Sequence, residues 1–251
     1  MNLIQAIILS IIEGIAEFLP ISSTGHLILA SSLLHIPQTD FVKSFEIAIQ
    51  LGAILAVVGL YWKKLWDYRL WPKIMAGFLP AAIIGLVGYH FIKQYLIGNT
   101  TVVLWSLFLG GLVLLFIDKL APGKQKNLDS LNIQSAVVIG VFQAISIIPG
   151  VSRAAATIIG GLLVGLDRQS AVEFSFLLAV PTMLAATGLD LVKSGLSFSS
   201  NEWLLLLVGF MGAMITAWLS VKFFLNFVKS HTFFWFGVYR IAISLLGWVV
   251  I

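Results

Sequence analysis

The stretch EGIAEFLPISSTGHL, which begins at Glu13, places acidic, hydroxyl and imidazole side chains inside a strongly apolar chain. Glu13 and Glu17 are four residues apart, so on a helix they share one face. A charge at the centre of a bilayer costs about 2.5–3.5 kcal/mol. Carboxylates at that depth therefore indicate a functional site, whose chemistry would be proton transfer or the binding of a cation.

A break in the same stretch predicts a site for an anion. Pro20 ends the first helix, and Ser22 or Ser23 then caps the next one, a position that serine favours. With Ser23 as the cap, His26 lies one turn into that helix, on the same side. Because the free N–H groups of a helix start bind anions, the break would hold a negatively charged ligand.

A second break, at Ser152-Arg153, supplies another helix start and a guanidinium, which can bind phosphate through two N–H groups. We expect the two breaks to converge near the middle of the membrane. Substrate contacts are expected from Ser22, Thr24, Ser152, Arg153 and Thr157. The opposing interpretation is that hydroxyl residues in membrane helices only help helices to pack, and for Ser22, Thr24 and Thr157 taken alone it is the better one.

Three further polar residues are candidates for supporting the site. Glu46 and Gln50 are four apart, and Arg240 lies midway along the last apolar segment. Arg240 could be a structural tie or part of the site. A purely structural network of acids and arginines is the alternative to catalysis.

The composition identifies the class of protein. The chain has 251 residues, of which 59% are hydrophobic and 10% charged, which is typical of a polytopic membrane protein rather than a soluble domain. The net charge of +4 then reflects membrane topology and not nucleic-acid binding. The absence of cysteine excludes disulfides and thiolate metal sites. The first residues lack a basic segment, so we expect no cleaved signal peptide, and residues 1–251 form one integral membrane domain.

The apolar segments predict an all-α fold. Since about 20 apolar residues span a bilayer, six segments are expected to cross it: 44–62, 74–92, 100–118, 171–192, 203–221 and 233–251. Residues 3–34 and 134–166 are each broken, and we expect both to be re-entrant helix–break–helix hairpins. Such irregular backbone is tolerated in a membrane only inside protein or beside water.

The two halves of the chain resemble each other. A shift of 129 residues places Pro20 on Pro149 and Ser23 on Ser152. The predicted order, one broken hairpin and then three spans, also recurs, in repeat 1 (about 1–118) and repeat 2 (about 130–251). An odd number of spans inverts the second copy, which predicts an inverted repeat with its site at the broken helices.

The basic residues predict the orientation. With re-entrant hairpins, ten lie on one side: Lys63, Lys64, Arg69, Lys73, Lys119, Lys124, Lys126, Arg168, Lys222 and Lys229. The other side has Lys43, Lys93 and Lys193. The positive-inside rule makes the first side cytoplasmic. Both termini and the first hairpin then open to the outer face.

Three stretches carry a resemblance to a known family: EGIAEFLPISSTGHL (13–27), PGVSRAAATIIGGLLVGLDR (149–168) and EFSFLLAVP (173–181). They closely resemble the bacterial undecaprenyl-diphosphatase family, also called bacitracin-resistance proteins. The resemblance implies hydrolysis of undecaprenyl diphosphate to the monophosphate at the bacterial cytoplasmic membrane, which recycles the lipid carrier of peptidoglycan synthesis. It also implies an active site made of Glu13, Glu17, Ser23, His26, Ser152 and Arg153. One departure is Ala154, where the family commonly has serine; if that hydroxyl contacts phosphate, its loss lowers affinity or rate.

The expected chemistry is phosphoryl transfer, which relies mainly on positioning and charge neutralisation. Ser23 would attack the terminal phosphorus while Glu17 or His26 takes its proton. The residues leave three nucleophiles open: Ser23, His26 and an activated water. A divalent cation, Mg²⁺ or Ca²⁺, held by Glu13 and Glu17 is expected as the cofactor. The expected partners are a polyprenyl diphosphate and the lipid bilayer, with no nucleic acid; the oligomeric state stays open, a dimer included.

The strongest alternative is a transporter or flippase of a prenyl phosphate lipid, since inverted repeats with broken helices are common in transporters. One protein could also combine both activities. The lipid phosphate phosphatases with a histidine nucleophile share only the Ser-Arg pair. Their pattern requires histidine six residues after the arginine, where this chain has Ile159.

Overall fold

In a computed structural model of the chain, residues 1–88, 92–96, 98–121, 126–193 and 198–250 are described. Within these ranges the secondary structure is helical, apart from one isolated bridge between Lys126 and Leu166. The predicted all-α class is confirmed. The α-helices are α1 (Leu3–Ala16), α2 (Ser23–Leu33), α3 (Asp40–Leu65), α4 (Trp71–Val87), α6 (Thr100–Leu120), α7 (Ile133–Ile145), α8 (Arg153–Leu163), α9 (Arg168–Lys193), α10 (Ser200–Phe227) and α11 (Phe234–Val250), with short η1 (Ile92–Leu96) and η2 (Leu128–Ser130).

Four helices are long and apolar enough to cross a membrane: α3, α6, α9 over Arg168–Gly188, and α10. They match four of the six predicted spans. The other two appear as α4 and α11, apolar helices of 17 residues each. Parts of these predicted spans (residues 89–91 and 251), and Lys124 of the topology count, lie outside the described residues. The count of six spans stays a prediction.

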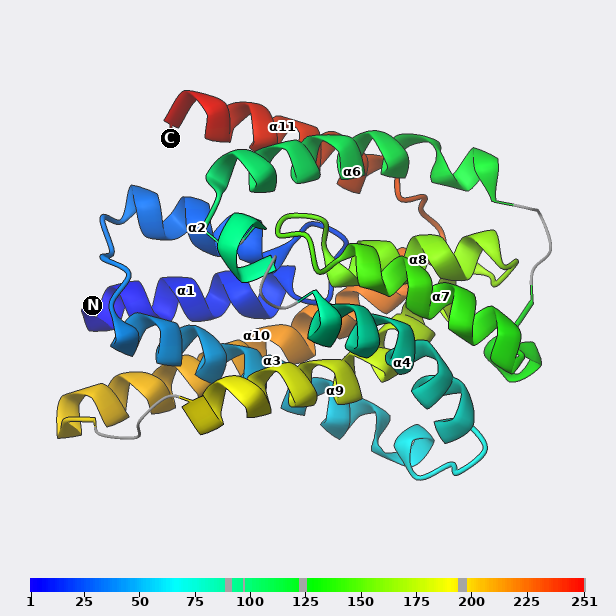
Figure 1. Cartoon of the computed structure of the whole chain (residues 1–251), viewed down its shortest axis with the longest axis horizontal. Coiled ribbons are helices and arrows are strands. Elements are labelled where there is room, and N and C mark those ends of the chain that lie inside the picture. The colour runs from blue at the N-terminus through cyan, green and yellow to red at the C-terminus, as the bar shows by residue number, and fades with distance from the viewer. Residues whose placement is uncertain (89–91, 97, 122–125, 194–197, 251) are drawn as a thin grey trace.

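Each predicted broken region consists of two short helices around an irregular segment. Residues 17–22 separate α1 from α2, and residues 146–152 separate α7 from α8. The longest of the four, α1, has 14 residues and is about 21 Å long, less than the roughly 30 Å of a bilayer core. Figure 1 shows both breaks near the middle of the molecule's long axis, with the start of α1 and the end of α11 at the same end.

The helix caps correct the predicted register of the two halves. Ser22 and Ser152 are the N-caps of α2 and α8, and both have a left-handed backbone, with φ of 72° and 75°. The equivalent positions at the breaks are therefore 130 residues apart, so the pairing of Ser23 with Ser152 was wrong. Ser23 corresponds to Arg153 instead. Because Ser22 caps α2, the Ser23 hydroxyl is not used by the helix start.

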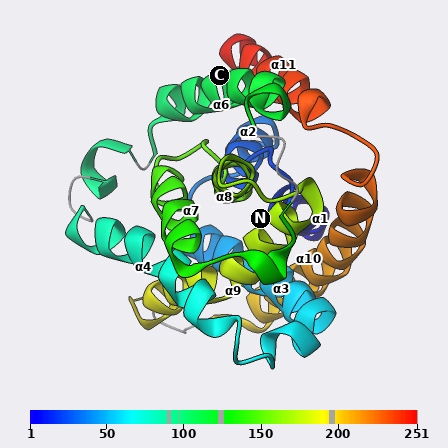
Figure 2. The same ribbon diagram turned by 90° about the vertical axis from the view of Figure 1, so that its right-hand side faces the viewer.

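The helices of the two halves pack on each other in a crossed pattern. α1 packs against α10, α4 against α7, and α6 against α11. Glycine permits the closest approach: a Cβ at Gly140 of α7 would lie 2.3 Å from the Gly77 carbonyl oxygen of α4. In the view along the helices, α8 lies near the centre with the other helices around it (Figure 2), and most of its residues are buried. The packing thus places the second break inside the protein.

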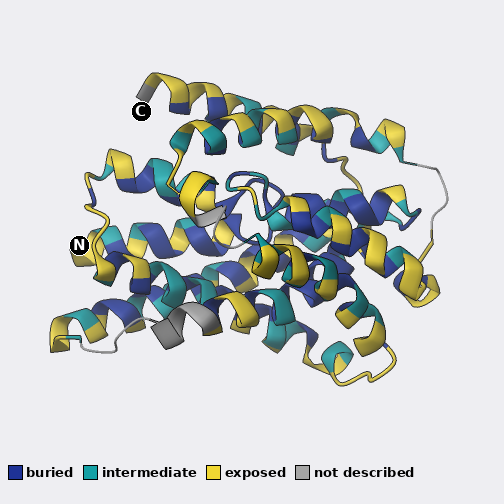
Figure 3. Ribbon diagram, viewed as in Figure 1, coloured by how far each residue is buried: buried dark blue, intermediate teal, exposed yellow. Residues whose placement is uncertain are grey.

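Burial is distributed as expected for a protein in lipid. Buried residues gather around the two breaks, and the outward faces of the helices are exposed (Figure 3). These exposed faces are largely apolar and include Trp66, Leu86 and Val249. Exposed apolar surface of this extent would be unfavourable in water, so lipid is its natural solvent.

Candidate active site

A polar cavity of about 170 Å³ lies between the two breaks. Its wall is formed by both break segments, by the first residues of α2 and α8, and by one residue each from α3 and α9. The lining residues are Glu17, Ser22, Ser23, Thr24, Gln50, Ser146, Pro149, Gly150, Ser152, Arg153 and Met183. The predicted convergence of the two breaks is thus present in the structure.

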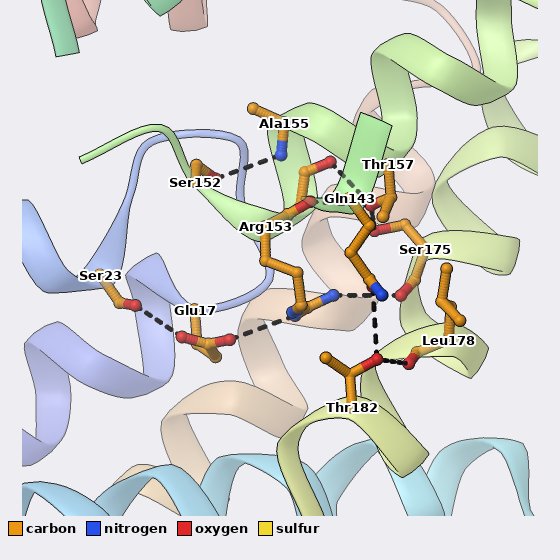
Figure 4. A network of polar contacts seen from close by, with 11 residues as sticks. Glu17, Ser23, Gln143, Ser152, Arg153, Ala155, Thr157, Ser175, Leu178 and Thr182 are labelled. Carbon is orange, nitrogen blue, oxygen red and sulfur yellow. Dashed lines mark hydrogen bonds and ion pairs between the residues drawn. The ribbon is translucent and has the colours of Figure 1, made fainter. Parts of the chain in front are cut away.

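Glu17 is the centre of the polar contacts in this cavity (Figure 4). Its Oε2 accepts a hydrogen bond from the Ser23 hydroxyl at 2.5 Å, and its Oε1 pairs with Arg153 Nη2 at 3.2 Å. All three residues are largely buried. A carboxylate bonded to a hydroxyl in this way can take the proton when the oxygen attacks, which is the arrangement of an activated nucleophile.

Arg153 is held in place from behind. Its Nη1 donates to the Ser175 carbonyl oxygen at 3.1 Å, and Thr157 Oγ1 lies 2.6 Å from Ser175 Oγ. Thr157 also donates to the Arg153 carbonyl at 2.9 Å, but it does not line the cavity. Thr157 therefore supports the arginine, whereas the sequence suggested substrate contact. Ser175 was missed, because a single serine in an apolar helix carries no distinguishing pattern.

The starts of α2 and α8 both face the cavity. The Ser22 hydroxyl accepts from the Gly25 N–H at 3.4 Å, and the Ser152 hydroxyl accepts from the Ala155 N–H at 3.1 Å. Both serines thus serve as caps as well as lining the cavity. The partial positive charge at the two helix starts adds to the charge of Arg153, which makes the cavity suited to an anion such as phosphate.

Glu13 lies next to this cluster without lining the cavity. It is fully buried, and neither of its carboxylate oxygens has a hydrogen-bond partner within the described part of the chain. It lies within electrostatic reach of Glu17, Glu46 and Arg153. Of the predicted supporting residues, Gln50 lines the cavity and Glu46 does not.

The described residues contain no group of three or more His, Cys, Asp or Glu side chains arranged to hold a metal ion. Mg²⁺ in phosphate chemistry needs fewer, since one or two carboxylates and the substrate's own phosphates suffice. The unpaired oxygens of buried Glu13, near Glu17, fit that smaller requirement.

His26 is not brought together with the cluster. It is absent from the cavity lining, and both of its ring nitrogens are engaged. Nδ1 lies 2.8 Å from the Ser22 carbonyl oxygen and Nε2 lies 2.7 Å from the hydroxyl of Tyr239, on α11. Since a carbonyl only accepts, Nδ1 carries the proton and Nε2 accepts from Tyr239. Tyr239, which no sequence motif indicated, thus orients this histidine.

Arg240 is fully buried and is a structural tie between the two breaks. Its five N–H groups donate to backbone carbonyls at 2.9–3.3 Å. The acceptors come from both breaks and from α6: Pro20, Gly150, Val151, Ser106 and Leu107. One side chain thereby joins the two irregular segments that form the cavity.

Comparisons with known proteins agree with this geometry. The family model described as "Bacitracin resistance protein BacA" matches residues 6–246. The chain belongs to this family. Similar curated proteins are named undecaprenyl-diphosphatase: that of Aquifex aeolicus is 56% identical and the alignment covers 96% of each chain. That of Sulfurihydrogenibium sp. is 48% identical, and the alignment covers 98% of each chain. That of Thermus thermophilus is also 48% identical, and the alignment covers 96% of this chain and 94% of the relative. The predicted resemblance is confirmed.

Within this BacA-family chain, the departure at Ala154 lies away from the cavity. Ala154 is fully buried in the apolar core and does not line the polar cavity. A hydroxyl at this position would face the core, so the alanine does not remove a phosphate contact from the cavity wall.

Proposed function

We propose that this chain hydrolyses undecaprenyl diphosphate to undecaprenyl phosphate and inorganic phosphate, and so recycles the lipid carrier of cell-wall polymers. The observation that carries the proposal is the contact of Glu17 with both Ser23 and Arg153 in a cavity enclosed by apolar helices. A nucleophile, its base and an anion-binding group are what phosphate hydrolysis requires. The relatives that are named undecaprenyl-diphosphatase support the same reaction.

The geometry favours Ser23 as the nucleophile. Its oxygen would attack the terminal phosphorus while Glu17 takes its proton, and the bond from that phosphorus to the bridging oxygen would break. Undecaprenyl phosphate then leaves, and water attacks the phosphoserine to release inorganic phosphate and restore the hydroxyl. Arg153 and the two helix starts would bind the phosphate oxygens as their charge shifts. His26 is the weaker candidate, because its ring nitrogens are already bonded outside the cavity.

Glu13 and Glu17 would hold the divalent cation, Mg²⁺ or Ca²⁺. When bound, the ion would neutralise charge on the diphosphate. The oxygens of Glu13 have no hydrogen-bond partner within the described part of the chain, and its side chain interacts electrostatically with Glu17. This lack of a partner supports the assignment.

The crossed packing supports the inverted repeat as a proposal. α1 of the first half packs on α10 of the second, and α7 of the second packs on α4 of the first, as a twofold exchange of the halves requires. With six spanning helices and two re-entrant hairpins, the ten-to-three division of basic residues would put both termini outside. The cavity would then open to the outer face of the bacterial cytoplasmic membrane.

Phosphate release from undecaprenyl diphosphate by the purified protein in detergent tests the function. We expect turnover, and we expect a chelator to abolish it. Detergent removes the two sides of a membrane, so a pure flippase would release no phosphate there. No observation in the structure favours the flippase over the phosphatase.

A further inference from the structure

A second cavity, apolar and larger, adjoins the polar one. Its volume is about 390 Å³, and it lies between α4, the break that follows α7, and α9. Small residues such as Ala82, Gly85 and Ala185 form much of its wall. Arg153 and Ser146 line both cavities, so the polar and apolar spaces meet at these two side chains.

Two side chains that line the apolar cavity, Gln143 and Arg153, have buried N–H groups without partners among the described residues. Gln143 is 1% exposed, and its Nε2 has no hydrogen-bond partner among the described residues, while its Oε1 accepts from Thr182 at 3.4 Å (Figure 4). The Nε of Arg153 is likewise buried and unpaired there. An unpaired buried donor is costly unless a ligand supplies an acceptor. The reaction steps above use neither of these N–H groups.

We propose that the apolar cavity holds the first isoprene units of the substrate, and that Gln143 and Arg153 Nε donate to the phosphate that carries the chain. This inference rests on the proposed function. With the terminal phosphate at Ser23, the second phosphate must lie one bridging oxygen away, and Arg153 reaches both positions from the shared wall. Leu86, which lines the apolar cavity, is 69% exposed, so the cavity reaches the apolar outer surface and the rest of the chain can continue from there into lipid.

Another apolar cavity, of about 330 Å³ between α6, α7 and α8, is the competing location for the chain. It has no lining residue in common with the polar cavity. A prenyl chain in that cavity would have no direct connection to Arg153 or Ser23. Because the cavity beside α4 shares Ser146 and Arg153 with the polar cavity, we assign the prenyl chain to that cavity.

Filling the cavity tests the proposal. A Cβ at Gly85 would meet only Ile147 Cδ1 within 4 Å, at 3.7 Å, so Gly85→Leu adds bulk without a backbone clash. The matched control is Gly59→Leu, at an exposed site on α3 with nothing within 4 Å. We expect Gly85→Leu to lower kcat/KM for farnesyl diphosphate about tenfold or more while ethyl diphosphate changes less than about twofold. Gly59→Leu should change neither.

The outcomes separate the two proposals. Equal losses for both substrates, or no loss for farnesyl diphosphate, would overturn the chain site and leave the phosphatase standing. A third variant, Val113→Phe, narrows the competing cavity. A chain-dependent loss in Val113→Phe alone would place the chain beside α6 and contradict the proposal. If the wild type releases phosphate from neither undecaprenyl diphosphate nor farnesyl diphosphate, the proposed function and this inference both fail.

Gln143→Met tests the second donor. Methionine keeps the size but removes the N–H groups, so we expect KM for farnesyl diphosphate to rise about 10- to 100-fold. The melting temperature should be unchanged or higher, because an unpaired buried donor is lost. Gln134→Met, at an exposed site on the same helix, is the control and should leave both values unchanged. A lower melting temperature with an unaltered KM would show that Gln143 is only structural.

Discussion

At the residue scale, the account depends on three side chains in direct contact. Glu17 joins Ser23 to Arg153, so the base, the nucleophile and the anion-binding group form one unit. The sequence predicted these three because charges within an apolar chain are costly and stand out. It could not predict Ser175 or Gln143, whose roles follow from packing against Arg153 and the cavities. It expected His26 beside the same site, whereas this side chain bonds to the Ser22 carbonyl and Tyr239 and does not line the cavity.

Glu17→Gln should lower the hydrolysis rate by about 10²–10⁴, because an amide cannot take the Ser23 proton. The amide oxygen can still accept from Ser23, but the buried ion pair with Arg153 is lost, so the melting temperature should also fall and the rate is compared at equal concentrations of folded protein. The rate and the melting curve of the purified variant are the measurements. Near-normal turnover in a folded Glu17→Gln protein would remove the glutamate from the reaction.

Arg153→Lys should lower the rate by about 10²–10³, the usual cost of losing one preorganised donor to a developing charge. Lysine keeps the charge but not the planar pair of N–H groups that grips two phosphate oxygens. Arg168→Lys is the control, because Arg168 pairs with Asp118 outside the cavity. A destabilised but still active Arg153→Lys variant would show that the arginine only balances the glutamates.

At the scale of the elements, the two breaks are the decisive structures. Pro20 and the Pro149-Gly150 pair predicted where they lie. The register between them was one residue off, because Ser22 and Ser23 are chemically identical candidates for the cap. Only the backbone conformation, with φ of 72° at Ser22, distinguishes the two. The role of Arg240 needed the structure as well, since its five acceptors are backbone carbonyls.

Arg240→Met should lower the melting temperature by several degrees, because five buried or partly buried carbonyls lose this donor at once. The two breaks would then be held less firmly, and the rate should fall with stability. Ser244→Ala, which removes one buried bond to the Leu104 carbonyl on the same helix pair, should have a much smaller effect. If Arg240→Met melts at the same temperature as the wild type, Arg240 does not hold the two breaks together.

At the scale of the whole molecule, orientation decides which face supplies the substrate. Gln38, in the exposed link between α2 and α3, should lie outside. The chain contains no cysteine, so Gln38→Cys would be the only thiol. We expect it to react with an impermeant thiol reagent in intact cells. Reaction only after the cells are permeabilised would reverse the orientation.

The number and packing of the helices in the whole molecule were predictable only in part. The apolar segments predicted the helical class and the two broken hairpins, because the segments of a chain that lie in a bilayer must be apolar. Length alone does not decide whether a 17-residue helix such as α4 or α11 crosses the bilayer, so the count of spans was harder to predict. The packing of α1 on α10 and of α7 on α4 is a tertiary contact between distant parts of the chain. In a single sequence, the only sign of it is the weak similarity between the two halves.

The central claim, that Ser23 is the nucleophile of a prenyl diphosphate phosphatase, is tested most directly by comparing two serine variants. Ser31 lies on the same helix, is buried, and its hydroxyl has no hydrogen-bond partner within the described part of the chain. The measurement is phosphate release from undecaprenyl diphosphate in detergent by the wild type, Ser23→Ala and Ser31→Ala at equal concentrations of folded protein. The account predicts a loss of about 10³-fold or more in Ser23→Ala and a rate close to that of the wild type in Ser31→Ala. A Ser23→Ala protein that releases phosphate at the wild-type rate would contradict it.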